Sequence, residues 1–120
     1  MSKLSFSELL LEIAEKKEKY FKNYLSYGKK IKDIARELLG NCQVLIFGSV
    51  IRGDFSPASD IDVLIISNKF PENWEERRIY RTKIKSAIEH SSPFQIHLAT
   101  EEEFKNWWQN FIKSEFVEIK

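Results

Sequence analysis

The chain has 120 residues, enough for one domain of ordinary size and too few for two. Charged residues make up 31% of it and leave a net charge of only +1, which argues against a nucleic-acid binder that works through bulk positive charge. A hydrophobic content of 42% argues against wholesale disorder. We therefore expect one folded domain over residues 1–120.

The compartment is indicated by what the sequence lacks. Cys42 is the single cysteine, so no internal disulfide can form, and its place before an apolar run is typical of packing. No signal-peptide pattern and no apolar run near 18 residues is present. We expect a soluble, cytoplasmic protein that does not contact a membrane.

The first element predicted is one long helix over about residues 6–39. Ser5 and Glu8 fit a capping box at its start, and Gly40 fits its end. Such a helix would span roughly 50 Å, whereas a compact domain of this size is only about 35 Å across. The helix must therefore either overhang the domain or bend, and Gly28 is the residue that most weakens its interior.

An apolar stripe with spacings of three and four runs along this helix. The stripe consists of Leu10, Ile13, Tyr20, Tyr24, Tyr27, Ile31, Ile34 and Leu38, interrupted by Lys17. It predicts packing against the chain's own sheet, or a surface shared with another chain, including a homodimer through the N-terminal helix. A base-stacking platform made by the three tyrosines is the less favoured alternative.

The remaining elements form a catalytic core over about residues 40–112. Strands are predicted at 43–47, 61–67 and 94–98. Helices are predicted at 73–90 and after Thr100, and residues 116–119 form a short strand or a fraying end. The second strand is apolar at nearly every position, as in strands that are covered on both faces. The predicted fold class is α/β: a short mixed sheet covered by helices.

The two later helices each carry an apolar face. For the helix at 73–90 the predicted buried residues are Trp74, Tyr80, Ile84, Ala87 and Ile88. The opposite side of this helix is basic and consists of Arg77, Arg78, Arg81, Lys83 and Lys85. We interpret this side as exposed to solvent, and contact with a polyanion is the alternative. The apolar side of the last helix consists of Phe104, Trp107, Trp108 and Phe111.

The candidate site lies between the first two strands. Asp60 and Asp62 are two residues apart, so their side chains are expected on one face of a strand. A divalent cation with hard oxygen ligands would relieve the repulsion between them. Upstream, Gly48 lets a phosphate approach the backbone and Ser49 offers a hydroxyl and an N–H, while Arg52 could reach a phosphate with its guanidinium. The pattern predicts a site for a metal-bound nucleoside triphosphate.

The spacing of this motif is Gly48-Ser49, ten intervening residues and then Asp60-Ile61-Asp62, with apolar strands on either side. It resembles the signature of the minimal nucleotidyltransferases of the polymerase-beta-like superfamily. The resemblance implies transfer of a nucleoside monophosphate, with ATP the expected donor, to a hydroxyl, with Mg²⁺ (or Mn²⁺) bound by Asp60 and Asp62. It also implies pairing with a helical HEPN-type protein, as an antitoxin that adenylylates its toxin.

The superfamily places a third carboxylate on the next strand, and the matching position here is Gln95, with His97 the less favoured position. Gln95 has no negative charge and cannot act as a general base, whereas a neutral His97 imidazole could accept a proton on the acceptor side. The main hypothesis is an active nucleotidyltransferase, with the acceptor hydroxyl plausibly on a partner protein. The alternative is a weak or inactive nucleotide- and partner-binding module, and direct nucleic-acid binding is the least favoured.

Overall fold

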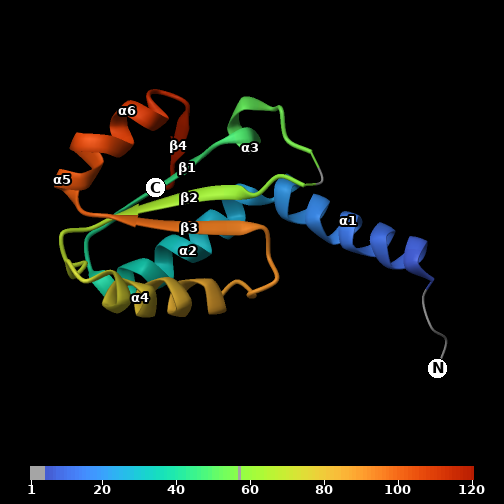
Figure 1. Ribbon diagram of the computed structural model, residues 1–120, viewed down its shortest axis with the longest axis horizontal. Helices are drawn as coiled ribbons and strands as arrows, with labels where there is room; N and C mark the ends of the chain where they lie inside the picture. Colours follow the sequence, from blue (N-terminus) through green and yellow to red (C-terminus); the bar gives the residue numbers. More distant parts are fainter. Residues whose placement is uncertain (1–4, 57) are drawn as a thin grey trace.

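The fold is a four-stranded mixed sheet with helices on both faces (Figure 1), seen in a computed structural model that describes residues 5–56 and 58–120. The strands are β1 (Gln43–Phe47), β2 (Ile61–Ile66), β3 (Phe94–Ala99) and β4 (Phe116–Glu118), in the spatial order β3-β2-β1-β4. β1 runs antiparallel to β2 and β4, and β2 runs parallel to β3. The predicted fold class is confirmed.

Two layers of helices bury the two faces of the sheet. On one face lie α2 (Tyr24–Leu39) and α4 (Trp74–Ser86), and on the other lie α5 (Glu101–Glu103), the π-helical turn η1 (Phe104–Trp108) and α6 (Gln109–Ile112) (Figure 1). Because side chains alternate along a strand, Val63 and Ile65 pack toward α2 and α4, while Leu64 and Ile66 pack toward η1 and α6. This double burial explains why β2 is apolar at nearly every position.

The predicted single N-terminal helix is in fact two helices, α1 (Phe6–Lys22) and α2. They are separated at Asn23, where the backbone leaves the helical region with φ −112° and ψ 26°, and Asn23 Nδ2 donates a hydrogen bond to the Lys19 carbonyl at 2.8 Å. The helix does not bend at Gly28, which lies buried inside α2. A Cβ there would lie 2.8 Å from Cδ1 of Ile46, so Gly28 allows α2 to approach the sheet closely.

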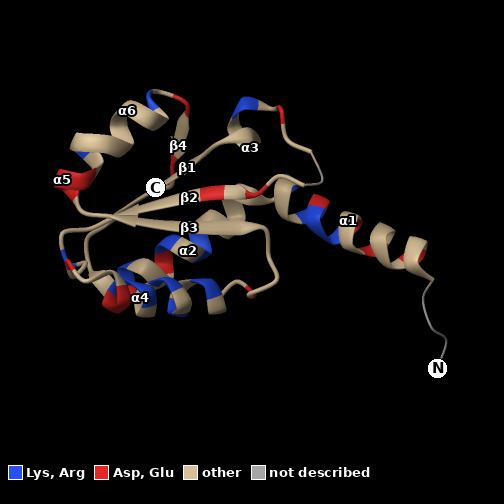
Figure 2. Ribbon diagram, viewed as in Figure 1, with Lys and Arg blue, Asp and Glu red and all other residues tan. Residues whose placement is uncertain are grey.

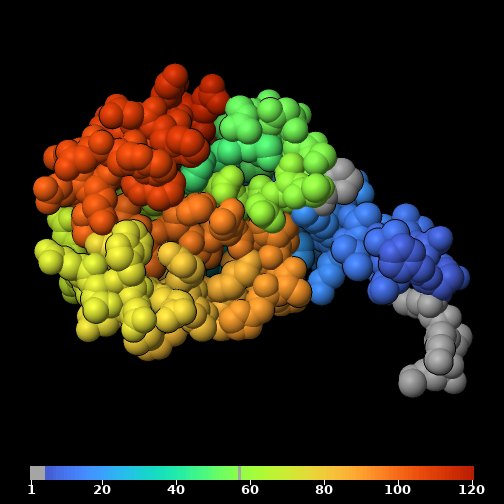
Figure 3. All heavy atoms as spheres, viewed as in Figure 1, coloured from blue at the N-terminus to red at the C-terminus, as the bar shows by residue number. Residues whose placement is uncertain are grey.

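The predicted overhang of the N-terminal helix does occur. The molecule measures 51 × 30 × 24 Å, and Figure 3 shows α1 projecting from the body. The C-terminal end of α1 is anchored by Tyr20 and Phe21, each 5% exposed. Its free part leaves large apolar side chains exposed: Phe6, Leu9, Leu10, Leu11 and Ile13. Within 5–56 and 58–120 no helix is both long and apolar enough for a membrane crossing.

Tyr20 is a structural residue and not part of a base platform. Its hydroxyl donates a hydrogen bond to Glu89 Oε2 at 2.9 Å, and its ring packs edge-on against Phe94. Burial, followed by the hydrogen bond and charge of Glu89, raises the pKa of Tyr20 to about 12. The contact ties α1 to the turn after α4.

The predicted faces of α4 are partly wrong. Trp74 is 62% exposed, and Ala87 follows the helix and is also exposed. Arg77, expected on a solvated side, is only 2% exposed because it donates to the Pro71 carbonyl and to Glu103 Oε1, the latter at 2.7 Å. Lys85 is half-buried and donates to the carbonyl groups of Ser92 and Phe94. Two of the five basic residues are therefore structural, and the helix ends at Ser86.

Candidate active site

The candidate site lies at the entrance of β2, on the sheet face that η1 and α6 cover. Asp62 is paired with Phe47 across β1 and with Gln95 across β3. Alternation places the side chains of Asp62, Gln95 and His97 on the same face as the buried residues Leu64 and Ala99. Figure 2 shows acidic segments at this end of β2. The register sets Asp62 and Gln95 side by side, whereas Asp60, predicted to share a strand face with Asp62, precedes β2.

Asp62 has a direct partner in His97. Nε2 of His97 lies 3.2 Å from Oδ1 of Asp62, and both side chains are about one quarter exposed, at 25% and 26%. The imidazole packs against the rings of Phe47 and Trp108, with centroid distances of 5.8 and 5.2 Å. The ring is therefore held by aromatic contacts and in turn positions the carboxylate.

Gly48 brings the turn between β1 and α3 against Asp62. Its φ of +89° lies in the left-handed region, and a Cβ at this position would overlap Asp62 Oδ2. The one-turn helix α3 (Ser49–Arg52) follows at once, and no described side chain caps its first N–H groups. The backbone donors after Gly48 and the Asp62 carboxylate thus share one small region.

Asp60 has different surroundings from Asp62. It precedes β2 and lines a hollow of about 460 Å³ together with residues of α1, among them Lys16 and Tyr20, and with Ser92 and Pro93. Burial lowers the pKa of Lys85, and the negative charge of Asp60 partly offsets that shift. Asp60 therefore lies between the sheet entrance and the overhanging helix.

The metal-binding potential of the site rests on these two carboxylates. In the described part of the chain, no three His, Cys, Asp or Glu side chains gather closely enough to form a metal site alone. Mg²⁺ at nucleotide sites is bound through one or two carboxylates together with substrate phosphates. A metal ion at Asp62 would therefore need oxygens of a triphosphate as further ligands, and Asp60 is the nearest further carboxylate in the chain.

A basic hollow adjoins the position of the expected third carboxylate. Gln95 and His97 line a space of about 310 Å³ with Arg81 and Lys85 of α4. Nε of Arg81 is buried there, and no described residue accepts a hydrogen bond from it. The hollow is therefore cationic on its α4 side, whereas the Gln95 side chain belongs to the opposite face of β3, the face that η1 and α6 cover.

Arg52, predicted to reach a phosphate, lies at the end of α3 with its side chain 48% exposed. Its Nε donates to Asp54 Oδ2 at 3.3 Å. Arg52 is near the Gly48–Ser49 turn in the chain, but its side chain is hydrogen-bonded to Asp54.

Comparison with known proteins identifies the family. A family model described as a nucleotidyltransferase domain matches residues 29–120. The chain belongs to the nucleotidyltransferase domain family. A protein of Methanocaldococcus jannaschii, named as a candidate protein adenylyltransferase, is 36% identical over 70 residues, which are 58% of this chain and 65% of that relative. The similarity to it thus spans less than two thirds of the relative's own length.

Solved structures of nucleotidyltransferase-like proteins agree with this assignment. One crystal structure of a candidate nucleotidyltransferase is 32% identical and superposes with a TM-score of 0.63, covering 77% of this chain and 96% of the other. A candidate nucleotidyltransferase from Sulfolobus solfataricus is 22% identical, with a TM-score of 0.57 over 98% of this chain and 89% of the other, which shows the fold alone. The resemblance predicted from the Gly-Ser and Asp-x-Asp pattern is confirmed at the level of the family.

Several residues around the candidate active site were not predicted from the sequence. Phe47 and Trp108 support His97, and Arg81 and Lys85 border Gln95. Phe47 could have been found, because it directly precedes Gly48 on a strand of known direction. Trp108 could not, since its contact depends on how the last helix returns over the sheet.

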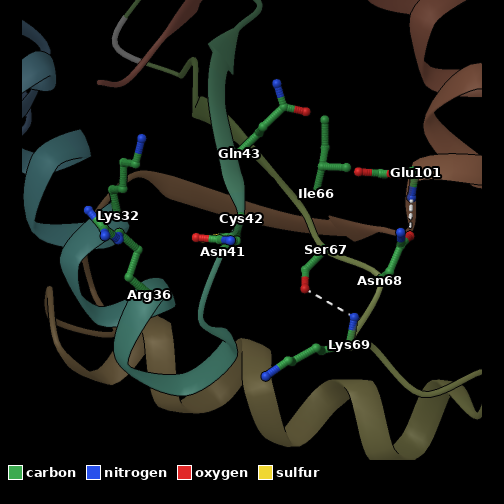
Figure 4. Close-up of a pocket in the computed structure, with 10 residues that line it drawn as sticks. All are labelled: Lys32, Arg36, Asn41, Cys42, Gln43, Ile66, Ser67, Asn68, Lys69 and Glu101. Atoms are coloured by element: carbon green, nitrogen blue, oxygen red, sulfur yellow. Dashed lines mark hydrogen bonds between the residues drawn. The ribbon is translucent and has the colours of Figure 1, made fainter.

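A third hollow lies at the opposite end of the sheet (Figure 4). It has a volume of about 630 Å³ and is lined by residues that include Lys32, Arg36, Cys42 and Lys69. Burial raises the pKa of the Cys42 thiol, and the positive charges of Lys32 and Arg36 only partly oppose this. β1 separates this hollow from Gly48 by about 15 Å, at 3.3 Å per residue, so it is not part of the candidate active site.

Proposed function

We propose that this chain transfers a nucleoside monophosphate, with ATP as the expected donor, to a hydroxyl group of an acceptor. The observation that carries the proposal is the contact between Gly48 and Asp62, where a side chain on the glycine would overlap the carboxylate. The contact sets a metal-binding carboxylate against backbone donors suited to phosphate. Membership of the nucleotidyltransferase family and the name of the M. jannaschii relative support the same chemistry.

The roles follow from the positions. The backbone and hydroxyl of the Gly48–Ser49 turn hold the triphosphate, with Arg52 as an additional phosphate contact once it leaves Asp54. Asp60 and Asp62 hold Mg²⁺ (or Mn²⁺), which supplies neutralisation of the phosphate charge when bound. Such transfer needs positioning and electrostatic stabilisation more than covalent help from the protein.

The reaction is balanced in one displacement. The acceptor oxygen forms a bond to the α-phosphorus. The bond between the α-phosphorus and the oxygen that bridges it to the β-phosphorus breaks, and pyrophosphate leaves with the electron pair of that bond. In the tautomer in which Nε2–H of His97 donates a hydrogen bond to Asp62 Oδ1, Nδ1 of the neutral ring is free to take the proton of the acceptor hydroxyl. Gln95 offers an amide to orient the acceptor, since its side chain shares a face of the sheet with those of Asp62 and His97.

The acceptor is presented by a partner protein. The overhanging helix α1 exposes Leu10 and Ile13, and Ile13 also lines the hollow that contains Asp60. A protein bound to α1 would therefore sit beside the entrance of the site. A HEPN-type helical protein, as in a toxin–antitoxin pair, is the expected occupant, and a second copy of the chain is the alternative.

Transfer from α-labelled ATP with Mg²⁺ to a co-expressed helical partner tests the proposal. Wild type and Asp33→Asn should label the acceptor equally, because Asp33 is an exposed residue of α2 paired with Lys29. Asp62→Asn should lower the rate at least about 100-fold, as expected when transition-state charge stabilisation is lost. Equal labelling by wild type and Asp62→Asn would refute the proposal.

A second candidate function is a binding module with weak or no turnover. The observation that favours it is the exposed Gln95, which stands opposite Asp62 where a carboxylate is expected. Under this reading Gln95→Glu should raise transfer sharply, whereas Gln43→Glu, at the other end of the sheet, should not. Fast transfer by wild type that Gln95→Glu leaves unchanged would exclude the binding module.

A further inference from the structure

Two aromatic rings near the candidate site are open to solvent. Trp107 on η1 is 55% exposed and Phe111 on α6 is 62% exposed. Their rings stack in parallel, with centroids 5.3 Å apart and planes inclined by only 11°. The pair, which we call the aromatic platform, belongs to the face of the last helix that was predicted to be buried. Its exposure leaves an apolar surface that a planar ligand could cover.

The aromatic platform is continuous with the candidate active site. Phe111 lies 6.3 Å from the ring of Phe47, which pairs directly with Asp62 and continues into Gly48. Trp107 packs on Trp108, whose ring contacts His97. Both rings of the platform are therefore one contact away from side chains that support the site. Figure 1 shows α6 and α3 on the same side of β2 and β3, with α3 toward the entrance of β2.

A local feature of the backbone produces this exposure. Residues 104–108 form a π-helical turn between α5 and α6, and such turns recur at functional sites. Phe104 and Trp108 pack on the buried face, whereas Trp107 is turned outward. The turn thus divides one aromatic-rich segment into a core half and an exposed half.

We propose that the aromatic platform stacks the base of the nucleoside triphosphate whose phosphates lie at the Gly48–Ser49 turn. This inference rests on the proposed function, since it needs the triphosphate at that turn. Aromatic stacking accepts any base because every base has a π-face, so the platform contributes affinity without reading the hydrogen-bonding edge of the base. The platform supplies affinity for the nucleoside, and the turn supplies affinity for the phosphates.

Binding measurements with two probes separate these contributions. ATP and inorganic tripolyphosphate, each with Mg²⁺, are titrated by calorimetry into the full chain and into Trp107→Ala and Phe111→Ala. Each variant should weaken ATP binding about tenfold, a size expected for one base–aromatic stack, and should leave tripolyphosphate binding unchanged. Trp107→Phe should retain most of the ATP affinity, because it retains an aromatic ring.

Trp74→Ala is the matched control. Trp74 is 62% exposed and stands on α4, on the opposite face of the sheet. Its removal should change neither titration, and ATP should still quench the tryptophan emission of this variant through Trp107 and Trp108.

The outcomes separate a failure of base stacking from a failure of the proposed function. If wild type binds neither probe, the proposed function fails and the inference with it. If wild type binds both probes with equal affinity, or if Trp107→Ala and Phe111→Ala bind ATP like wild type, the inference alone is overturned. Loss of protein labelling by these variants with ATP binding intact would show instead that the platform docks the acceptor protein.

Discussion

Nε2 of His97 lies 3.2 Å from Oδ1 of Asp62, and this contact joins two neighbouring parallel strands at the entrance of the site. The imidazole is itself held by Phe47 and Trp108. Groups that orient a metal-binding carboxylate are part of the working site, because the ligand must be held in one direction. The aromatic packing of the last helix is thereby coupled to the carboxylate on β2.

Replacing His97 should reduce transfer without unfolding the protein. His97→Asn removes the group that positions Asp62, and loss of such a partner lowers metal affinity or activity about 10- to 100-fold. Transfer rate and its dependence on Mg²⁺ concentration are the measurements. His90→Asn is the control, since His90 is exposed after α4 and its ring nitrogen contacts Ser86. Equal rates for the two variants would contradict a positioning role.

Gly48→Ala should abolish activity through a steric effect. The new Cβ would displace the Asp62 carboxylate, and the residue would also be strained by its φ of +89°. Gly53→Ala separates these causes, because Gly53 has a φ of +81° but nothing lies within 4 Å of the added Cβ. Gly53→Ala should lose about 1–2 kcal/mol of stability from its αL backbone, and Gly48→Ala up to about 3 kcal/mol, because its φ of 89° and ψ of −156° are essentially reserved for glycine. Only Gly48→Ala should lose transfer, and an active Gly48→Ala would rule out close contact between the turn and Asp62.

The family and the strand order near the site could be predicted from the sequence because they depend on local signals. Gly48, Asp60 and Asp62 lie next to apolar strands whose direction and alternation fix the faces. The break at Asn23 could not be predicted, since the apolar stripe continues through it and a side-chain hydrogen bond stabilises it. The burial of Arg77 likewise depends on Glu103, 26 residues away, which no periodicity reveals.

Gly28→Ala should destabilise the protein although it raises helix propensity. The added Cβ would lie 2.8 Å from Cδ1 of Ile46 and 2.9 Å from Cδ1 of Ile119, both in the core. Overpacking of this kind costs about 1–3 kcal/mol, against a propensity gain of up to about 1 kcal/mol. Urea unfolding should show a net loss near 1 kcal/mol. Ser26→Ala, on the exposed side of α2, is the control and should be neutral or slightly stabilising.

Glu103 should make the stability of the last helix depend on acid pH. Burial alone would raise its pKa, but hydrogen bonds from Arg77 and Thr100 outweigh burial and lower the pKa below its ordinary value of 4.5. A lowered pKa in the folded state means that the carboxylate stabilises the protein above pH 4.5 and that this contribution is lost as the pH falls through the folded-state pKa.

Glu103→Gln measures this contribution directly. At pH 7 the variant should lose about 1 kcal/mol, because the buried Arg77 keeps an amide oxygen but no longer has a charged partner. The loss stays small because the Glu103 side chain is 38% exposed and solvent screens the pair. Urea unfolding from pH 7 to pH 3 should show the difference from wild type closing below about pH 4.5. Glu102→Gln, exposed in the same turn, should show no such pH-dependent difference, and a constant gap for Glu103→Gln would mean that packing, not charge, links α4 to α5.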